Sequence, residues 1–154
     1  VTLEDIARIA DGFYIGGTKV GAMFGEAVVF THGNMPKNFV TLVKQHGALL
    51  AKGWLLGVQF DTLFTDDLYC RIARHANDAA DRIREVLVER GYTLTFDAPT
   101  NQIFITLDNA TSERLQRNVR LGFMEKADDT HTVMRICTSW ATTDEQVEQL
   151  IALL

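Results

Sequence analysis

Apolar positions repeat with a helical period over residues 66–90. The face that they form carries Leu68, Ile72, Ala76, Ala79, Ile83 and Leu87. Charged residues of both signs occupy much of the rest of this stretch, as they do on a solvated helix surface. Gly91 follows, and a glycine in this place commonly ends a helix. The pattern predicts one long amphipathic helix.

Shorter patterns before this helix predict two strands and a second helix. Residues 11–17 and 26–31 are rich in aromatic and β-branched residues and are bounded by glycine, which is typical of strands. Residues 37–46 are expected to form a helix with Pro36 in its first turn. The first half of the chain is therefore expected to alternate strands with helices.

Three further strands are expected after the long helix, at residues 93–96, 102–107 and 132–138. A helix at residues 112–121 is expected between the last two strands. A final helix begins at about Thr143, where Thr142 and Glu145 fit a capping box. This order of elements predicts a two-layer α+β module with its helices on one face of a mainly antiparallel sheet.

Composition and charge narrow the classes of partner. The chain has 154 residues, 47% of them hydrophobic, and a formal net charge of −5. A phosphate-binding surface needs a clustered basic excess, so no nucleic-acid partner is expected. No apolar run approaches the roughly 20 residues needed to span a bilayer, and the N-terminus lacks the layout of a secretory signal. A cytoplasmic protein without a membrane partner is expected.

Cysteine and histidine spacing indicates neither disulfides nor a metal site. Cys70 and Cys137 are far apart in the sequence and are expected to be reduced packing residues. The four histidines show no paired ligand spacing, so no metal is expected.

One lysine, Lys19, lies where an exposed surface lysine is out of place. It follows apolar residues 13–15 and has glycines on both sides, at positions 16, 17, 21 and 25. Glycines let a backbone or a flat ligand approach closely. A lysine in such a space loses hydration, which favours the neutral nucleophilic amine that Schiff-base chemistry needs. The alternative is a loop lysine that points into water between two strands, and spacing alone leaves both open.

Arg135 is the second candidate. Alternation within the expected strand places it on the same face as Val133 and Cys137. A desolvated charge without a partner is strongly unfavourable, and the guanidinium fork matches a carboxylate. The carboxylate of a ligand would serve. The alternatives are a salt bridge to an acidic residue elsewhere in the fold, or an arginine on an edge strand in water.

Residues 11–30, DGFYIGGTKVGAMFGEAVVF, closely resemble the lysine segment of the threonine aldolase and aromatic amino acid β-eliminating lyase family, which depends on pyridoxal phosphate. The resemblance continues in order through residues 44–64, 68–83, 99–104 and 134–147. In that family the lysine of the GGTK segment is bonded to the cofactor, and Lys19 falls on it. The arginine of an R-x-x-T-S-W-A-T segment binds the substrate α-carboxylate there, and Arg135 falls on it.

The resemblance also implies residues near the cofactor phosphate. The Thr18 hydroxyl is expected to bind the phosphate or only to stabilise the turn. Lys44 and Lys52 flank a loop where family members often carry basic residues that face the phosphate. The loop in this chain departs from the commoner glycine-rich version, which ends in arginine and glutamine.

The fold implied by the resemblance is α/β, of the pyridoxal-phosphate-dependent transferase type (fold type I). Residues 1–75 would be the C-terminal part of the large cofactor domain, and residues 76–154 a small C-terminal α+β domain. Family members are much longer, so the chain is expected to be a C-terminal fragment and inactive alone. A homodimer or homotetramer is expected.

The activity implied is that of a threonine-aldolase-type lyase. It would cleave the Cα–Cβ bond of L-threonine, L-allo-threonine or a related β-hydroxy amino acid to glycine and an aldehyde. One alternative is a β-eliminating lyase that acts on aromatic or sulfur-containing amino acids. Another is a non-catalytic α/β association module that has kept the residues without the chemistry.

Overall fold

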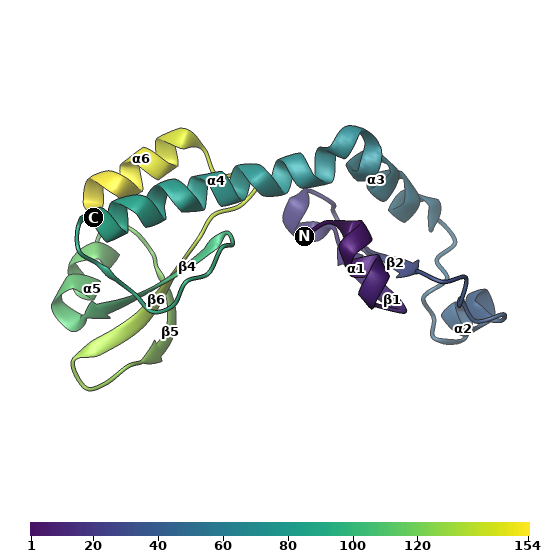
Figure 1. Ribbon diagram of the computed structural model, residues 1–154, viewed down its shortest axis with the longest axis horizontal. Helices are drawn as coiled ribbons and strands as arrows, with labels where there is room; N and C mark the ends of the chain where they lie inside the picture. The colour runs from purple at the N-terminus through teal and green to yellow at the C-terminus, as the bar shows by residue number, and fades with distance from the viewer. The chain divides into compact units, whose positions relative to one another are not determined.

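A computed structural model describes residues 1–154, and the chain divides into two compact units, Val1–Tyr69 and Cys70–Leu154 (Figure 1). The division falls at the beginning of helix α4, Leu68–Glu89. The resemblance predicts a boundary after residue 75, inside the same helix.

The first unit is built around a two-stranded antiparallel sheet. Its elements in chain order are α1 (Leu3–Ile9), β1 (Gly12–Gly16), the 3-10 turn η1 (Thr18–Val20), β2 (Glu26–Phe30), α2 (Phe39–Gln45), α3 (Trp54–Phe64) and the 3-10 turn η2 (Thr65–Asp67). Strands β1 and β2 pair from Gly12 opposite Phe30 to Gly16 opposite Glu26. Both expected strands are therefore present.

Two helices of the first unit were not predicted. Helix α1 begins with a capping box, in which Thr2 accepts from the amide of Asp5 and the Asp5 side chain accepts from the amide of Thr2. Helix α3 buries Phe60 and Leu63 but leaves Trp54 and other large apolar side chains exposed. The apolar residues of α3 lie on all sides of the helix and form no single stripe. Its sequence therefore shows no helical period.

The second unit is a two-layer α+β domain. Its remaining elements are β3 (Thr93–Leu94), β4 (Gln102–Asp108), α5 (Asn109–Gln116), β5 (Gly122–Lys126), β6 (His131–Cys137) and α6 (Asp144–Leu153). The four strands are all antiparallel in the order β3-β4-β6-β5. Figure 1 shows α4 and α6 side by side over one face of this sheet. The predicted α/β fold class is confirmed, and the domain has the expected layers.

Strand register separates the two faces of the sheet. Ile103 lies opposite Ile136, and Ile105 opposite Met134, and all four belong to the core. The helices contribute Ala79, Ala80, Ile83, Leu87, Leu115 and Val147 to the same core. The alternate residues of β4 and β6, including Phe104 and its partner Arg135, therefore lie on the other face.

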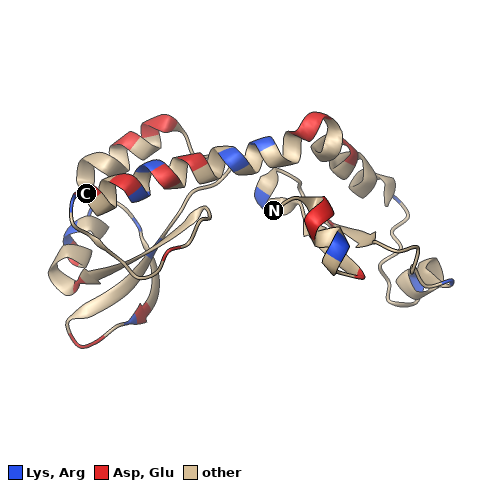
Figure 2. Ribbon diagram, in the orientation of Figure 1, with Lys and Arg blue, Asp and Glu red and all other residues tan.

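Contacts outside the core also join α4 to the C-terminal segment. The Thr138 hydroxyl donates to the Ala76 carbonyl at 2.6 Å, and His75 Nε2 lies 2.8 Å from the Thr142 carbonyl. Arg82 forms ion pairs with Asp144 and Glu148 of α6. Figure 2 shows that basic and acidic residues are interspersed along α4. No helix has both the length and the apolar character needed to cross a membrane.

Two helices begin later in the chain than predicted, α4 by two residues and α2 by two residues. Helix α4 begins at Leu68, because Asp66 and Asp67 have left-handed φ angles of 51° and 58°. Its end is as expected, with Gly91 at φ 77°. Helix α2 begins at Phe39, whose amide first closes a turn onto the Pro36 carbonyl.

The C-terminal domain has three further differences from the prediction. The capping box of α6 joins Thr143 and Gln146, because the Thr142 hydroxyl accepts from the Ser139 amide instead. Helix α5 begins earlier than expected, where Asp108 accepts from the Thr111 amide. Strand β5 was not predicted; it lies at the sheet edge and is largely exposed. Both cysteines are exposed rather than packed.

Candidate active site

The lysine turn follows directly from strand β1. Lys19 lies at the centre of η1, and the amides of Val20 and Ala22 both donate to the Gly17 carbonyl, at 3.0 and 2.9 Å. The next residue after η1, Gly21, has a left-handed φ of 101° that side chains rarely tolerate. Buried Val20 and Ala22 anchor the turn, whereas Lys19 is exposed.

Helix α3 holds this turn in place. A Cβ at Gly17 would lie 2.7 Å from the Ala22 Cβ and 2.9 Å from the Phe60 ring, so only glycine fits there. Gln59 accepts from the Met23 amide at 2.6 Å and donates to the Phe24 carbonyl at 3.2 Å. Gly17 and Gly25 thus permit close packing of α3 on the turn, whereas Gly16 and Gly21 have open space around them. Gln59 and Phe60 were missed because α3 itself was missed.

The other cofactor candidates in the first unit are also exposed. The Thr18 hydroxyl makes no hydrogen bond with the rest of the chain, so it does not stabilise the turn. Lys44 lies in the last turn of α2, and Lys52 in the turn before α3. No ion pair within the chain involves any of its lysines. The first unit therefore leaves these polar groups accessible and does not itself enclose Lys19.

Arg135 is part of the second unit, on the central strand β6, with β4 on one side and β5 on the other. Its Nη1 donates to Gln102 Oε1 at 3.2 Å, and its Nε is buried without a hydrogen-bond partner. No carboxylate of the chain lies within 4.0 Å of the guanidinium. Arg135 therefore forms no salt bridge within the chain and does not lie on an edge strand, so both alternative interpretations of this residue were wrong.

A half-buried guanidinium in this state is costly to the fold. An unsatisfied buried donor costs about 1–3 kcal/mol, and more when the group is charged. A ligand carboxylate would supply both the missing acceptors and the missing negative charge.

Gln102 contacts Arg135, whereas the sequence suggested no more than a turn-capping role for Asn101 and Gln102. Its neighbour Asn101 donates to the Thr138 carbonyl at 2.7 Å, which fixes the start of β4 against the end of β6. Gln102 itself reaches across to Arg135. The two residues are 33 positions apart, and they meet only because β4 and β6 pair in one register. No local sequence pattern predicts that register.

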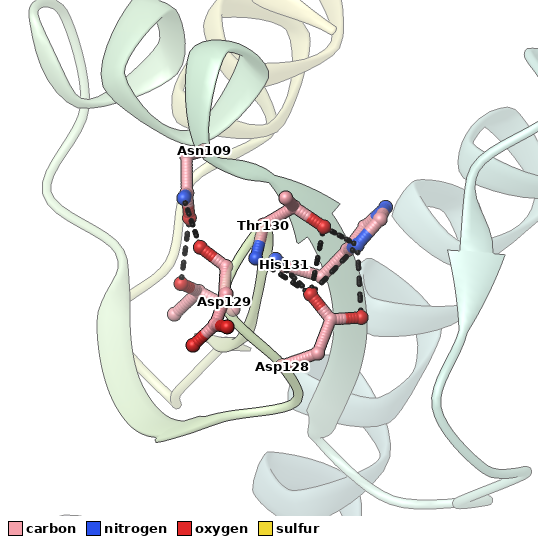
Figure 3. Close-up of polar contacts among 6 residues, drawn as sticks. Asn109, Asp128, Asp129, Thr130 and His131 are labelled. Carbon is pink, nitrogen blue, oxygen red and sulfur yellow. Dashed lines mark hydrogen bonds and ion pairs between the residues drawn. The ribbon is translucent and has the colours of Figure 1, made fainter.

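A second polar cluster occupies the turn between β5 and β6 (Figure 3). Asp128 accepts from the Thr130 hydroxyl at 2.8 Å, the Thr130 amide at 2.6 Å and the His131 amide at 2.8 Å, and its Oδ2 lies 3.1 Å from His131 Nδ1. These bonds, from Thr130 first and then His131, hold the pKa of Asp128 well below its ordinary value. No three His, Cys, Asp or Glu side chains of the chain are grouped to hold a metal ion.

The cavity beside this turn has a volume of about 570 Å³ and includes two arginines. Arg90 donates to the Ile151 carbonyl at 2.7 Å, and Arg114 to the Leu153 carbonyl at 3.1 Å. The two guanidinium groups thus bind the exposed carbonyls at the end of α6, where the helix dipole favours positive charge. Their position is explained by the fold.

Comparisons with known proteins agree on one group of enzymes. A low specificity L-threonine aldolase of Pseudomonas aeruginosa is 30% identical over 141 residues, which cover 91% of this chain and 40% of that enzyme. The structure of Leishmania major threonine aldolase matches 99% of this chain and 45% of that chain, with a TM-score of 0.92 and 39% identity. No family profile matches the chain.

More distant structures share only the fold. Sphingomonas wittichii serine palmitoyltransferase matches 93% of this chain and 38% of that chain, with a TM-score of 0.61 and 19% identity. A serine palmitoyltransferase of S. paucimobilis, a variant solved with a bound PLP–myriocin aldimine, matches 93% of this chain and 38% of that chain, with a TM-score of 0.59 and 13% identity. The chain spans about 40% of the length of the curated relatives that it matches, and corresponds to their C-terminal part.

Proposed function

Because the chain belongs to the threonine aldolase group of the fold type I proteins, we propose that a protein carrying it is a pyridoxal-phosphate-dependent lyase. Its substrates would be L-threonine, L-allo-threonine or related β-hydroxy amino acids, cleaved at the Cα–Cβ bond to glycine and an aldehyde. The observation that carries the proposal is the match to a threonine aldolase structure over 99% of the chain at 39% identity.

Arg135 is proposed to bind the α-carboxylate of the amino acid. Its charge has no acidic partner within the chain, and its buried Nε has no acceptor, so the fold leaves this group available for a ligand. Two N–H groups of a guanidinium match the two oxygens of a carboxylate. Fixing the carboxylate orients the substrate, so that the bond to be broken is held in one direction.

Lys19 is proposed to hold the cofactor covalently and later to move a proton at the substrate α-carbon. An exposed amine without an ion pair, on a turn fixed by Gly17 and Phe60, fits this role because it is accessible while its backbone is held. Pyridoxal phosphate, when bound, supplies an electron sink for the bond-breaking step. The lysine amine is within the class of groups that act as general bases in enzymes.

Thr18, Lys44 and Lys52 are proposed to contact the cofactor phosphate. All three are exposed, and Thr18 has a hydroxyl that no other group of the chain uses. Two ammonium groups and a hydroxyl donor suit a dianionic phosphate, which accepts several charge-assisted hydrogen bonds.

The proposed protein is a homodimer or homotetramer.

The test is turnover of L-threonine to acetaldehyde by the protein that carries this chain, loaded with pyridoxal phosphate. Lys19→Ala is expected to lower kcat by about 100-fold or more, since a residue that transfers protons contributes 10²–10⁴-fold. The control, Lys37→Ala, removes another exposed lysine of the same unit and should leave turnover unchanged. Full activity of the Lys19 variant would refute the proposed role.

The β-eliminating alternative is tested in the same preparation. Pyruvate released from β-substituted amino acids, with no acetaldehyde from L-threonine, would favour that reaction over aldol cleavage.

The 154 residues alone are proposed to be inactive. The first unit leaves Lys19 exposed, so its own residues supply no wall to exclude water from a bound cofactor. An absorbance titration of this polypeptide with pyridoxal phosphate should show only weak binding, and tight binding would contradict this part of the proposal.

A further inference from the structure

We propose that Gln102 is a positioning residue for Arg135, on the basis of the function proposed above. Its neutral amide holds one end of the guanidinium in place and leaves the positive charge for the carboxylate of the substrate. Gln102 thereby orients the group that binds the substrate without competing for it.

The contact follows from strand register. Arg135 lies opposite Phe104 in the β4–β6 pair, and Gln102 lies opposite Cys137. Gln102 is thus a diagonal neighbour of Arg135 on the same face, a spacing that long side chains can cross. Gln102 Oε1 accepts from Arg135 Nη1 at 3.2 Å, and this is the one hydrogen bond of the guanidinium within the chain.

The backbone around Gln102 is held independently of that contact. Its amide donates to the Thr100 hydroxyl at 3.3 Å, and the Thr138 amide donates to the Asn101 carbonyl at 3.0 Å. Arg84 donates to the carbonyls of Ala98 and Thr100 at 2.7 and 3.0 Å. Several bonds therefore hold the backbone from which the Gln102 side chain extends.

The chemistry of an amide suits this role better than that of a carboxylate. A glutamate at position 102 would have nearly the same shape but would form an ion pair with Arg135. That pair would satisfy the guanidinium within the protein and compete with a ligand carboxylate. An amide accepts the same hydrogen bond and leaves the net charge unchanged.

The β5 side of Arg135 is also kept clear. Gly122 lies opposite Arg135 in the β5–β6 pair, and a Cβ there would lie 3.6 Å from Arg135 Nε. The guanidinium therefore lies between an amide on one neighbouring strand and a residue without a side chain on the other.

The experiment uses the full protein loaded with pyridoxal phosphate. Gln102→Glu is expected to raise the KM for L-threonine by about 10-fold or more, the lower end of what a charge-assisted hydrogen bond is worth, with kcat nearly unchanged. Gln102→Met, which only removes the acceptor, should raise KM by a smaller factor, about 3- to 10-fold. The inhibition constants of glycine and ethanolamine, measured against L-threonine, separate carboxylate binding from other effects.

Glycine has both an amine and a carboxylate, whereas ethanolamine has an amine and a hydroxyl but no carboxylate. In Gln102→Glu the inhibition constant of glycine should rise in parallel with KM, while that of ethanolamine stays the same. Gln116→Glu, on the exposed side of α5, adds the same charge elsewhere and should change neither constant. Thermal unfolding of each variant shows whether it is folded.

Two kinds of failure are distinguishable. If the unsubstituted protein neither cleaves L-threonine nor binds glycine, the proposed function fails and this inference fails with it. If that protein is active but both Gln102 variants keep its KM and glycine inhibition constant, only the positioning role is refuted. Equal weakening of glycine and ethanolamine would also refute it, since it would indicate general structural damage.

Discussion

Replacing Arg135 by methionine should leave the stability of the second unit nearly unchanged, although the residue is half-buried in a central strand. The substitution removes one hydrogen bond, from Nη1 to Gln102, worth about 1.5–3 kcal/mol for a charged donor. It also removes the buried Nε, whose missing partner costs about 1–3 kcal/mol. Since the two terms nearly cancel, the free energy of unfolding should change by less than about 1 kcal/mol.

A second arginine of the same unit provides the matched comparison. Arg84 has only 15% of its side chain exposed, and both of its Nη atoms have partners: Nη1 pairs with Asp81, and Nη2 donates to the carbonyls of Ala98 and Thr100. Arg84→Met would leave both carbonyls without their donor. Counting only these two bonds, at about 1–1.5 kcal/mol each, the loss should be about 2–3 kcal/mol.

The assay is urea-induced unfolding followed by tryptophan fluorescence. The chain has two tryptophans, Trp54 in the first unit and Trp140 in the second, so a Trp54→Phe background reports on the second unit. Arg135→Met and Arg84→Met are compared in that background. If Arg135→Met destabilised the unit as much as Arg84→Met, Arg135 would be a structural residue, and the argument that its charge is kept for a ligand would be refuted.

Three further predictions concern the stability of the two units. Gly17→Ala should destabilise the first unit by about 1–3 kcal/mol, because the added Cβ would lie 2.9 Å from the Phe60 ring. A Cβ at Gly16 would have no atom within 4 Å, so Gly16→Ala should cost less, and urea unfolding of the two variants measures the difference. Thr143→Ala should cost about 1 kcal/mol through loss of the α6 N-cap, measured as a lower urea midpoint. The pKa of Asp128 is lowered in the folded state, so its contribution to stability is present above the unfolded value near 3.8 and is lost as the pH falls towards the lower folded value. The melting temperatures of the unsubstituted chain and Asp128→Asn should therefore differ at neutral pH, and the difference should shrink progressively as the pH falls below about 4. A difference that stays constant would contradict this origin of the Asp128 contribution.

Elements with a clear period were predictable. The apolar stripe of the long helix could be read directly, because Ala76, Ile83 and Leu87 recur at helical spacing and are all buried. Strands β4 and β6 were predicted to within one residue at each end, since apolar and polar residues alternate in both. Helix α3 and strand β5 lack such a pattern, so nothing local marked them.

The candidate site was only partly accessible to sequence reasoning. Lys19 and Arg135 stood out by residue type and setting, and the resemblance to threonine aldolases supplied roles that remain proposals. The glycine-bounded turn left two alternatives open for Lys19, a desolvated amine and a lysine that points into water, and within its own unit Lys19 is exposed. In the structure Gly17 allows Ala22 and the Phe60 ring of α3 to approach the turn closely.

The sequence by itself determined the class of the protein and the two residues on which its chemistry is proposed to depend, because both signals lie within short stretches of chain. Only the tertiary structure decided the surroundings of Arg135. It places Arg135 on a central strand, beside the neutral acceptor Gln102 and without an acidic partner. Those facts depend on which strands pair and in which register, and pairing joins residues far apart in sequence. A charge can be seen in a sequence, but whether it is compensated is decided only by the fold.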